Sequence, residues 1–259
     1  MSKTYTLITG ASEGIGRGFA EAFAADGRNL IIVARNGARL ATLKAELEAR
    51  HSIDVIVIVQ DLAVPEAARN IATAAADREI DCLVNNAGFQ VPAGPFSQNQ
   101  SAEVGAMIAV NITALTDLTR VFLPAIIASR GAIINVASHA AFQPVPYMAA
   151  YAATKAYVLH LTEALGQELA DSNPGEVYVM ALCPGATKTE FWNRSASPVE
   201  NTRFSVMTVE AVVDVAMREL KRRRETVVIP SFLLRAATQS LRVSTRTLNL
   251  KIARMLMGH

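Results

Sequence analysis

The sequence predicts an α/β fold with a doubly wound, seven-stranded parallel sheet and a helical extension at the C-terminus. Apolar segments of strand length, such as "LIIVA" (30–34) and "VIVIV" (55–59), alternate with helical patterns along the chain. Strands that are apolar throughout are typical of a parallel sheet covered by helices on both faces. Since no linker or repeat divides the 259 residues, we expect one domain over 1–259.

The elements follow one another in a regular order. Strands are expected at 4–9, 29–34, 53–60, 80–85, 132–138, 177–183 and 226–230. Helices are expected at 14–26, 37–50, 65–77, 102–129, 150–170 and 208–224. We expect the helix over 102–129 to break or end near Pro124, because proline has no backbone N–H to donate. The loops 86–101 and 184–208 follow strand ends, where such sheets bind their ligands.

Composition narrows the class of protein. Apolar residues make up 51% of the chain and charged residues 19%, which allows a substantial core. No apolar run approaches the length that spans a bilayer, and the N-terminus lacks a signal-peptide pattern, so we expect a cytoplasmic protein. Cys82 and Cys183 fall in expected buried strands. Neither they nor the four histidines have the spacing of metal ligands, so no metal site is expected.

A glycine-rich turn, "TGASEGIG" (9–16), joins the first strand to the first helix. Gly10, Gly14 and Gly16 allow a tight turn and a close approach of the backbone to a ligand. The helix N-terminus adds free N–H groups and the positive end of the helix dipole. These features suit a dinucleotide pyrophosphate. The common GxGxxG pattern is absent, because Phe19 stands where its third glycine would fall.

The end of the second strand indicates which dinucleotide is bound. NAD sites place a carboxylate there to bind the ribose 2′-hydroxyl, but this chain has Arg35, which suits a 2′-phosphate. NADP(H) is therefore favoured, and NAD(H) is the alternative because Glu13 would lie near the same phosphate and repel it. Asp61 could accept a hydrogen bond from the adenine amino group or cap the turn before Pro65.

The expected helix 150–170 carries Tyr151 and Lys155, which lie on one helix face because they are four residues apart. A lysine beside a phenol stabilises the phenolate and so lowers the tyrosine pKa from its ordinary value near 10. A tuned phenol can supply the proton that accompanies hydride transfer to a carbonyl. Ser138 ends the fifth strand and could donate a hydrogen bond to that carbonyl. Asn111 is a polar residue inside an apolar helix, and its burial would require a partner.

These residues resemble the motifs of the classical short-chain dehydrogenase/reductase family. The matching segments are "TGASEGIG" (9–16), "NNAG" (85–88), "YAATK" (151–155) and "PGATKTEF" (184–191). Asn111, Ser138, Tyr151 and Lys155 match the family's catalytic tetrad in order and spacing. The resemblance covers about residues 4–230 and implies a Rossmann fold, a nicotinamide cofactor and a homodimer or homotetramer.

The resemblance also implies roles for single residues. Tyr151 would be the acid/base, Lys155 would lower its pKa and bind the nicotinamide ribose, Ser138 would orient the carbonyl, and Asn111 would hold the water of a proton relay. Thr187 and Thr189 would position the nicotinamide. The expected cofactor-binding residues are Gly10, Ser12, Glu13, Gly14, Ile15, Gly16, Arg35, Asp61, Leu62, Asn85, Ala87, Gly88, Tyr151, Lys155, Pro184, Gly185, Thr187 and Thr189.

The function expected from this set is an NADP(H)-dependent oxidoreductase that interconverts a carbonyl and its alcohol. Aromatic residues of the pocket loops indicate an apolar ketone or aldehyde, with a 3-oxoacyl compound among the candidates; they are Phe89, Phe96, Phe142, Tyr147, Phe191 and Trp192. His139 is interpreted as a surface residue at a strand end. The alternatives are an NAD-preferring dehydrogenase and a regulatory member of the family that binds dinucleotide without catalysis. The complete tetrad favours an enzyme.

The C-terminal extension, 231–259, is basic. Residues 218–259 hold ten basic and two acidic residues, a charge of +8, while the rest of the chain, with 15 basic and 21 acidic residues, carries −6. An apolar stripe runs beside the cations. This extension could cover the substrate pocket or a subunit interface, lie on an anionic membrane, attract an acidic carrier, or be a plain helical extension with solvated arginines. No nucleic-acid-binding motif accompanies it.

Overall fold

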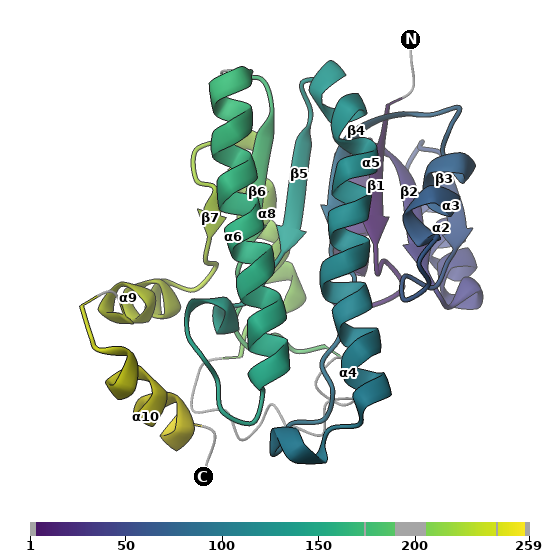
Figure 1. The fold of residues 1–259 in the computed structure, drawn as a ribbon. Helices are drawn as coiled ribbons and strands as arrows, with labels where there is room; N and C mark the ends of the chain where they lie inside the picture. Colours follow the sequence, from purple (N-terminus) through teal and green to yellow (C-terminus); the bar gives the residue numbers. More distant parts are fainter. Residues whose placement is uncertain (1–3, 174, 190–205, 242, 257–259) are drawn as a thin grey trace.

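The computed structural model describes residues 4–173, 175–189, 206–241 and 243–256 (Figure 1). The strands form one seven-stranded sheet in the order β3-β2-β1-β4-β5-β6-β7, and every neighbouring pair is parallel. The strands are β1 (Thr4–Thr9), β2 (Asn29–Ala34), β3 (Val55–Val59), β4 (Glu79–Asn85), β5 (Ala132–Val136), β6 (Tyr178–Leu182) and β7 (Val227–Val228). The predicted doubly wound α/β fold is confirmed.

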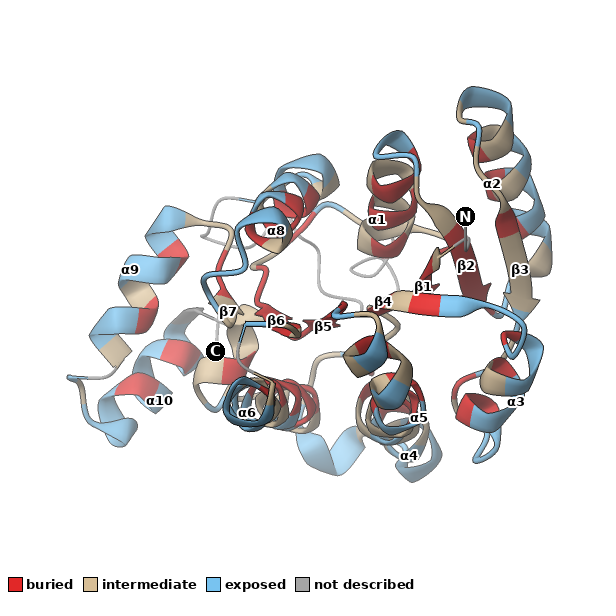
Figure 2. Ribbon diagram, turned by 90° about the horizontal axis from the view of Figure 1, so that it is seen from above, coloured by how far each residue is buried: buried red, intermediate tan, exposed pale blue. Residues whose placement is uncertain are grey.

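Helices cover both faces of the sheet, as Figure 2 shows. One face carries α1 (Gly14–Ala25), α2 (Gly37–Arg50) and α8 (Val209–Arg222). The other carries α3 (Ala67–Ala74), α5 (Leu115–Ala128) and α6 (Ala149–Ser172). The short η1 (Phe96–Gln98) and η3 (His139–Phe142) lie in the loops after β4 and β5.

The layers explain why the strands are apolar at every position. Leu30 and Ile32 of β2 pack into the core under α1 and α2, whereas Ile31 and Val33 pack into the core under α3 and α5. Successive side chains of a strand point to opposite faces, and here both faces are covered. All four side chains are fully buried. The same arrangement places the ends of the central strands together at one edge of the sheet.

The long helix after β4 breaks at a place that differs from the expected one. It consists of α4 (Ser101–Ile108), a π-helical turn η2 (Ala109–Ala114) and α5, so the irregularity surrounds Asn111. Pro124 lies inside α5 without ending it. Both Pro124 and Arg120, whose carbonyl loses the proline's N–H, are exposed, so water can solvate that carbonyl. The prediction of a break near Pro124 was wrong.

The segment Ser101–Ala128 is long and apolar enough to cross a membrane by length and composition, with a mean hydropathy of 1.4. It is the one helical segment of the described residues for which this holds. The sequence analysis did not anticipate it, because polar residues interrupt the apolar ones along this segment. In the fold, Leu118, Phe122 and Ile126 of this segment are buried in the core against the sheet. It therefore packs as a core helix of this domain.

The C-terminal extension forms two helices, α9 (Phe232–Leu241) and α10 (Arg246–Leu256), beside the end of β7 (Figure 1). Leu234, Thr238, Asn249 and Ala253 are buried. The predicted apolar stripe is instead largely exposed: Phe232, Leu233, Leu248 and Ile252 are 80%, 68%, 48% and 43% exposed.

Candidate active site

A cavity of about 1210 Å³ opens at the carboxyl edge of the sheet. Residues that directly follow β1 to β6 line it, as the topology requires. It takes in the predicted catalytic residues Ser138, Tyr151 and Lys155. It also takes in all the predicted cofactor residues except Gly16 and Asn85, and it does not take in Asn111. Phe191 and Trp192 lie outside the described residues.

The glycine-rich turn after β1 needs glycines at Gly10, Gly14 and Gly16, either for backbone conformation or for close packing. Gly10 and Gly14 adopt left-handed backbone angles, with φ of 65° and 55°. A Cβ on Gly16 would lie 2.2 Å from the Gly10 carbonyl oxygen, so the packing of the turn excludes any other residue there. Gly16 therefore packs against the turn without lining the cavity, whereas Gly10 and Gly14 line it.

Asn86 holds this turn, and the sequence reasoning missed it. Its Nδ2 donates to the carbonyl oxygens of Thr9, at 2.9 Å, and Gly10, at 3.2 Å. Its backbone N–H donates to the Thr9 hydroxyl at 3.0 Å. The signal was present in "NNAG", where only the first asparagine was chosen. These three bonds tie the turn after β1 to the end of β4.

Asn85 has a different place from the one expected, because its side chain points away from the cavity. Its Nδ2 donates to Thr119 of α5, at 3.0 Å, and to Asn135 of β5, at 2.9 Å. Asn135 in turn donates to Thr162 of α6 at 3.0 Å. All four side chains are buried. Asn85 therefore joins the centre of the sheet to two helices, and a role in lining the cofactor is not supported by its position.

The start of α1 fits a dinucleotide pyrophosphate. Its first turn contains no acidic residue, and the Glu13 side chain makes no capping bond to the helix. The first amides of the helix are therefore available for an anion at the cavity wall formed by Ser12, Gly14 and Ile15. Together with the close packing at Gly10 and Gly16, this arrangement suits the diphosphate of a nicotinamide dinucleotide.

Two arginines and the Glu13 carboxylate lie on one part of the cavity wall. Arg39, from the first turn of α2, forms an ion pair with the Glu13 carboxylate. The pair offsets the negative charge that was expected to repel a phosphate. Arg35 lines the cavity beside them, and its side chain makes no ion pair with any described residue. Arg39 was not among the predicted cofactor-binding residues, although it follows Arg35 by four residues in "VARNGARL".

Asp61 lies on the cavity wall next to Leu62. One of its carboxylate oxygens accepts a hydrogen bond from the Ala63 N–H at 2.9 Å. This bond is the capping arrangement weighed as an alternative, although α3 begins only at Ala67. The same carboxylate still faces the cavity, so the expected contact with adenine stays a prediction.

The three predicted catalytic side chains that line the cavity come from the loop after β5 and from α6. Ser138 directly follows β5, and its Oγ accepts a hydrogen bond from the Ala140 N–H at 3.1 Å and shares a further one with Tyr151. Lys155 Nζ donates to the Val136 carbonyl at 2.8 Å and lies 5.9 Å from the centre of the Tyr151 ring. The hydroxyl, the phenol and the ammonium therefore share one wall of the cavity.

Burial sets the acidity of both ionisable groups. It raises the pKa of Tyr151 to about 12, against a lowering by the Ser138 hydrogen bond. It lowers the pKa of Lys155 to about 8. The sequence led us to expect a lowered tyrosine pKa, but desolvation outweighs the other contributions in this geometry. Tyr151 is thus a neutral phenol at pH 7, the form that can donate a proton.

Asn111 acts through its side chain on two neighbouring segments. Its Oδ1 accepts from the Phe89 N–H, and its Nδ2 donates to the Phe89 carbonyl, both at 3.0 Å. Nδ2 also donates to Thr154 Oγ1 at 3.1 Å. Asn111 thus joins the loop after β4 to the catalytic helix, and a Cβ on Gly88 would lie 3.1 Å from its Oδ1. The expected proton-relay water stays a prediction.

The wall after β6 is held by the C-terminal extension. A Cβ on Gly185 would lie 2.4 Å from Leu234 of α9, so the two surfaces are in close contact. Thr187 is buried and forms a parallel bridge with Met207. Leu234 and Ala253 line the cavity beside Pro184 and Thr189. Of the roles considered for the extension, this position favours covering the pocket.

His139 is not the surface residue that was expected. It lines the cavity, its Nε2 lies 3.2 Å from the Thr238 hydroxyl of α9, and its ring packs against Phe142. Burial lowers its pKa below the ordinary value. The segment that carries Ser138 is therefore fastened to the C-terminal extension through its next residue.

Comparison with known proteins agrees with this site. A family model described as "short chain dehydrogenase" matches residues 4–200. The chain therefore belongs to the short-chain dehydrogenase family, and its seven-stranded parallel sheet with flanking helices is a Rossmann-like fold.

Three similar proteins illustrate the range of the family. A solved short-chain dehydrogenase from Sphingobium yanoikuyae, in complex with NADPH, is 38% identical with a TM-score of 0.81, covering 94% of this chain and 96% of that one. The very-long-chain 3-oxoacyl-CoA reductase of Pyrenophora tritici-repentis is 30% identical, covering 85% of this chain and 64% of that protein. The "inactive hydroxysteroid dehydrogenase-like protein 1" of Pongo abelii is 32% identical, covering 70% of this chain and 54% of that protein. The chain thus spans between half and two thirds of the length of these two curated relatives.

Proposed function

We propose that this protein is an NADP(H)-dependent carbonyl reductase that acts on an apolar ketone or aldehyde. The observation that carries the proposal is that Ser138, Tyr151 and Lys155 line the same cavity as the glycine-rich turn. One cavity thus joins a wall that suits a dinucleotide to a proton donor, which hydride transfer to a carbonyl requires.

The nicotinamide, when bound, supplies a hydride to the carbonyl carbon. The Ser138 hydroxyl donates a hydrogen bond to the carbonyl oxygen and fixes its position. Tyr151 then gives its phenolic proton to the same oxygen, and the product is the alcohol. The ammonium of Lys155, 5.9 Å from the ring centre, stabilises the phenolate left behind. The reverse sequence oxidises the alcohol.

The preference for NADP(H) is supported by charge. Arg35 is available for a 2′-phosphate, and Arg39 offsets the charge of Glu13. The relative from Sphingobium yanoikuyae binds NADPH, which is in line with this preference.

The substrate class is supported by the walls around Tyr151. Val91, Met107 and Tyr151 form an apolar cluster against which Phe89 and Met148 pack. Such walls suit a bulky apolar carbonyl compound, and the similarity to a 3-oxoacyl-CoA reductase keeps a 3-oxoacyl chain among the candidates.

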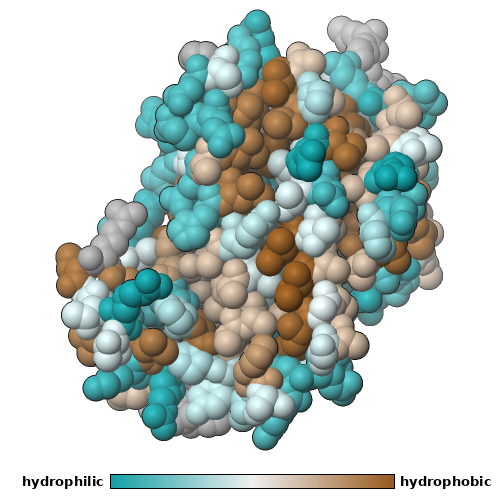
Figure 3. Space-filling view, in the orientation of Figure 1, coloured by the Kyte–Doolittle hydropathy of each residue, from teal (hydrophilic) through white to brown (hydrophobic). Residues whose placement is uncertain are grey.

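Assembly of like chains is part of the proposal. Figure 3 shows apolar side chains gathered on the face formed by α5 and α6. Val121 of α5 and Tyr157 of α6 are 44% and 39% exposed there. Burying such residues against a second copy would support the predicted homodimer or homotetramer.

A regulatory role without catalysis is the second candidate, because one similar protein carries the name "inactive". The complete tetrad in this chain argues against it.

The test is fluorescence titration with NADPH and NADH, followed by a screen of ketones with wild type and Tyr151→Phe. We expect tighter binding of NADPH, lost in Arg35→Ala, and turnover that Tyr151→Phe abolishes. Equal NADH binding would overturn the cofactor preference, and binding without any turnover would favour the regulatory role.

A further inference from the structure

Two glutamine side chains at the cavity lack partners. Gln90 is 6% exposed, and both its amide nitrogen and its amide oxygen are buried without a hydrogen bond to any described residue. The amide oxygen of Gln143 is also buried without a hydrogen bond to any described residue. Both residues line the cavity that holds Tyr151. No other described side chain at this cavity has a buried polar atom without a partner.

The surroundings of Gln90 offer the amide little compensation. Its chain neighbours Phe89 and Val91 belong to the apolar cluster around Tyr151, with Met107 buried at its centre. Gln143 directly follows η3, the short helix that begins after Ser138. The two glutamines thus reach the cavity from the loops after β4 and β5.

An unsatisfied buried amide has an energetic cost. Leaving a buried donor or acceptor without a partner costs about 1–3 kcal/mol, and Gln90 leaves both kinds unpaired. A leucine of similar size would avoid this cost. Among the described residues, Arg28 Nε and Asn85 Oδ1 are also buried without a partner, but each of these side chains is hydrogen-bonded through another atom. Gln90 differs because neither of its side-chain polar atoms has a partner in the described part of the chain. The exception at the cavity therefore points to a ligand that pairs with the amide.

We infer that Gln90, assisted by Gln143, binds a second, uncharged polar group of the substrate, remote from the reacting carbonyl. The inference rests on the proposed function, because it describes the substrate of the same site. An amide that offers both a donor and an acceptor matches a hydroxyl group, whereas a carbonyl group would pair with its donor alone. The substrate would then be a bulky apolar ketone that carries a hydroxyl or a second carbonyl.

The first experiment measures binding rather than turnover. NADPH-loaded Tyr151→Phe protein is titrated calorimetrically with α-tetralone, a fused bicyclic ketone. The same protein is then titrated with ring-hydroxylated α-tetralones, a set of isomers that differ only in the position of the hydroxyl group. We expect at least one isomer to bind roughly tenfold more tightly than the parent ketone, as a buried hydrogen-bond pair warrants. Adding Gln90→Leu should remove this preference and leave the affinity for the parent within about threefold.

Two controls separate substrate recognition from other roles of the amide. Gln167→Leu changes a glutamine on the exposed face of α6, which bonds to Asp171, and should leave the preference intact. The melting temperature of Gln90→Leu should be unchanged or raised, because an unpaired buried amide is replaced by an apolar group of similar volume. A structural glutamine would lower it.

Three results would overturn the inference. They are a preference that survives Gln90→Leu, no isomer that binds more tightly than the parent, and a loss of NADPH affinity in Gln90→Leu that would assign the amide to the cofactor. Turnover of the same ketones by the wild-type protein is measured separately. A binding preference without turnover would reject the proposed reductase activity while leaving the recognition by Gln90 established.

Discussion

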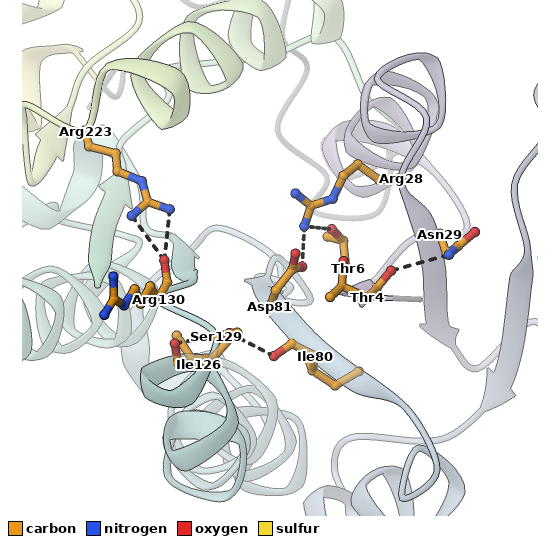
Figure 4. A network of polar contacts seen from close by, with 10 residues as sticks. All are labelled: Thr4, Thr6, Arg28, Asn29, Ile80, Asp81, Ile126, Ser129, Arg130 and Arg223. Carbon is orange, nitrogen blue, oxygen red and sulfur yellow. Dashed lines mark hydrogen bonds and ion pairs between the residues drawn. The ribbon is translucent and has the colours of Figure 1, made fainter. Parts of the chain in front are cut away.

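The two edges of the sheet are both rich in polar side chains, but they use them differently. At the amino edge, Arg28 pairs with Asp81 and Thr6, and Arg223 donates to the carbonyl of Arg130, as Figure 4 shows. At the carboxyl edge, Gln90 lacks partners and Lys155 is a buried ammonium whose pKa falls to about 8. At the amino edge the charged groups are paired, although burial raises the pKa of Asp81 and leaves Arg28 Nε without a partner among the described residues. At the carboxyl edge neither polar atom of Gln90 has a described partner and no described carboxylate pairs with Lys155, so we expect the polar groups there to contribute less to stability.

The largest effect is expected at the carboxyl edge, where the loss of the phenolic proton of Tyr151 should slow the reaction. Tyr151→Phe should lower the rate of ketone reduction by roughly 10²–10⁴-fold, the usual contribution of a positioned acid. The free energy of unfolding should change little, because the ring and its packing stay in place. The measurement is NADPH oxidation by wild type and variant, with urea unfolding as the control. A variant that keeps a tenth or more of the wild-type rate would show that Tyr151 is not the proton donor.

Removing the buried ammonium should separate stability from activity. The pKa of Lys155 is about 8, below its ordinary 10.5, so the folded state disfavours the charge and loses stability at pH 7, below both values. Lys155→Met should therefore raise the free energy of unfolding at pH 7 by up to about 3 kcal/mol, at 1.36 kcal/mol per pKa unit, and abolish turnover.

The gain should shrink as the pH rises from 8 towards 10.5 and vanish above it, because the unfolded lysine then loses its proton too. Urea unfolding at pH 7 and at pH 10.5 checks both statements. A less stable variant at pH 7 would show that the Lys155 bond to the Val136 carbonyl outweighs the burial of its charge.

The amino edge should respond in the opposite way. Arg28→Met keeps the side-chain stem but leaves the Asp81 carboxylate, 17% exposed, without its cation. We expect a loss of about 1–2 kcal/mol in the free energy of unfolding and an unchanged rate of turnover. Arg50→Met, which breaks an exposed pair with Glu46 on α2, is the matched control and should cost under about 0.5 kcal/mol. Equal losses in both variants, or lost turnover in Arg28→Met, would break the contrast.

The smallest expected effect concerns His139. Burial holds its pKa below the ordinary 6.5, so the unfolded chain binds the proton more readily. The contribution of this residue is therefore present above about pH 6.5 and is lost as the pH falls towards the folded pKa. Thermal unfolding between pH 5 and 8 should show a shallower acid-side slope for His139→Gln than for wild type. Identical slopes would contradict the prediction.

Much of the fold could be read from the sequence, because local patterns decide it. The strands at 4–9 and 29–34 and the helix at 37–50 have the bounds that were expected. The exceptions lie where tertiary packing decides. Pro124 continues a helix because its side of α5 faces water, and β7 shrinks to Val227–Val228 at the edge of the sheet.

The candidate site shows the same division. Motif spacing identified Ser138, Tyr151 and Lys155, because a strand end and a helical repeat of four fix their places in any such fold. It chose Asn85 rather than Asn86, because neighbouring residues of a strand end point in opposite directions and the sequence does not state which one faces the cavity.

The sequence by itself determined the sheet, its covering helices, the glycine turn and the catalytic residue types, since short-range sterics and hydrophobic periodicity act over a few residues. Only the tertiary structure decided which polar groups lie without partners, which charges offset one another and how far burial moves a pKa. Those quantities depend on side chains brought together from distant parts of the chain, such as Glu13 with Arg39 and His139 with Thr238. They are the quantities that turn a common fold into one particular site.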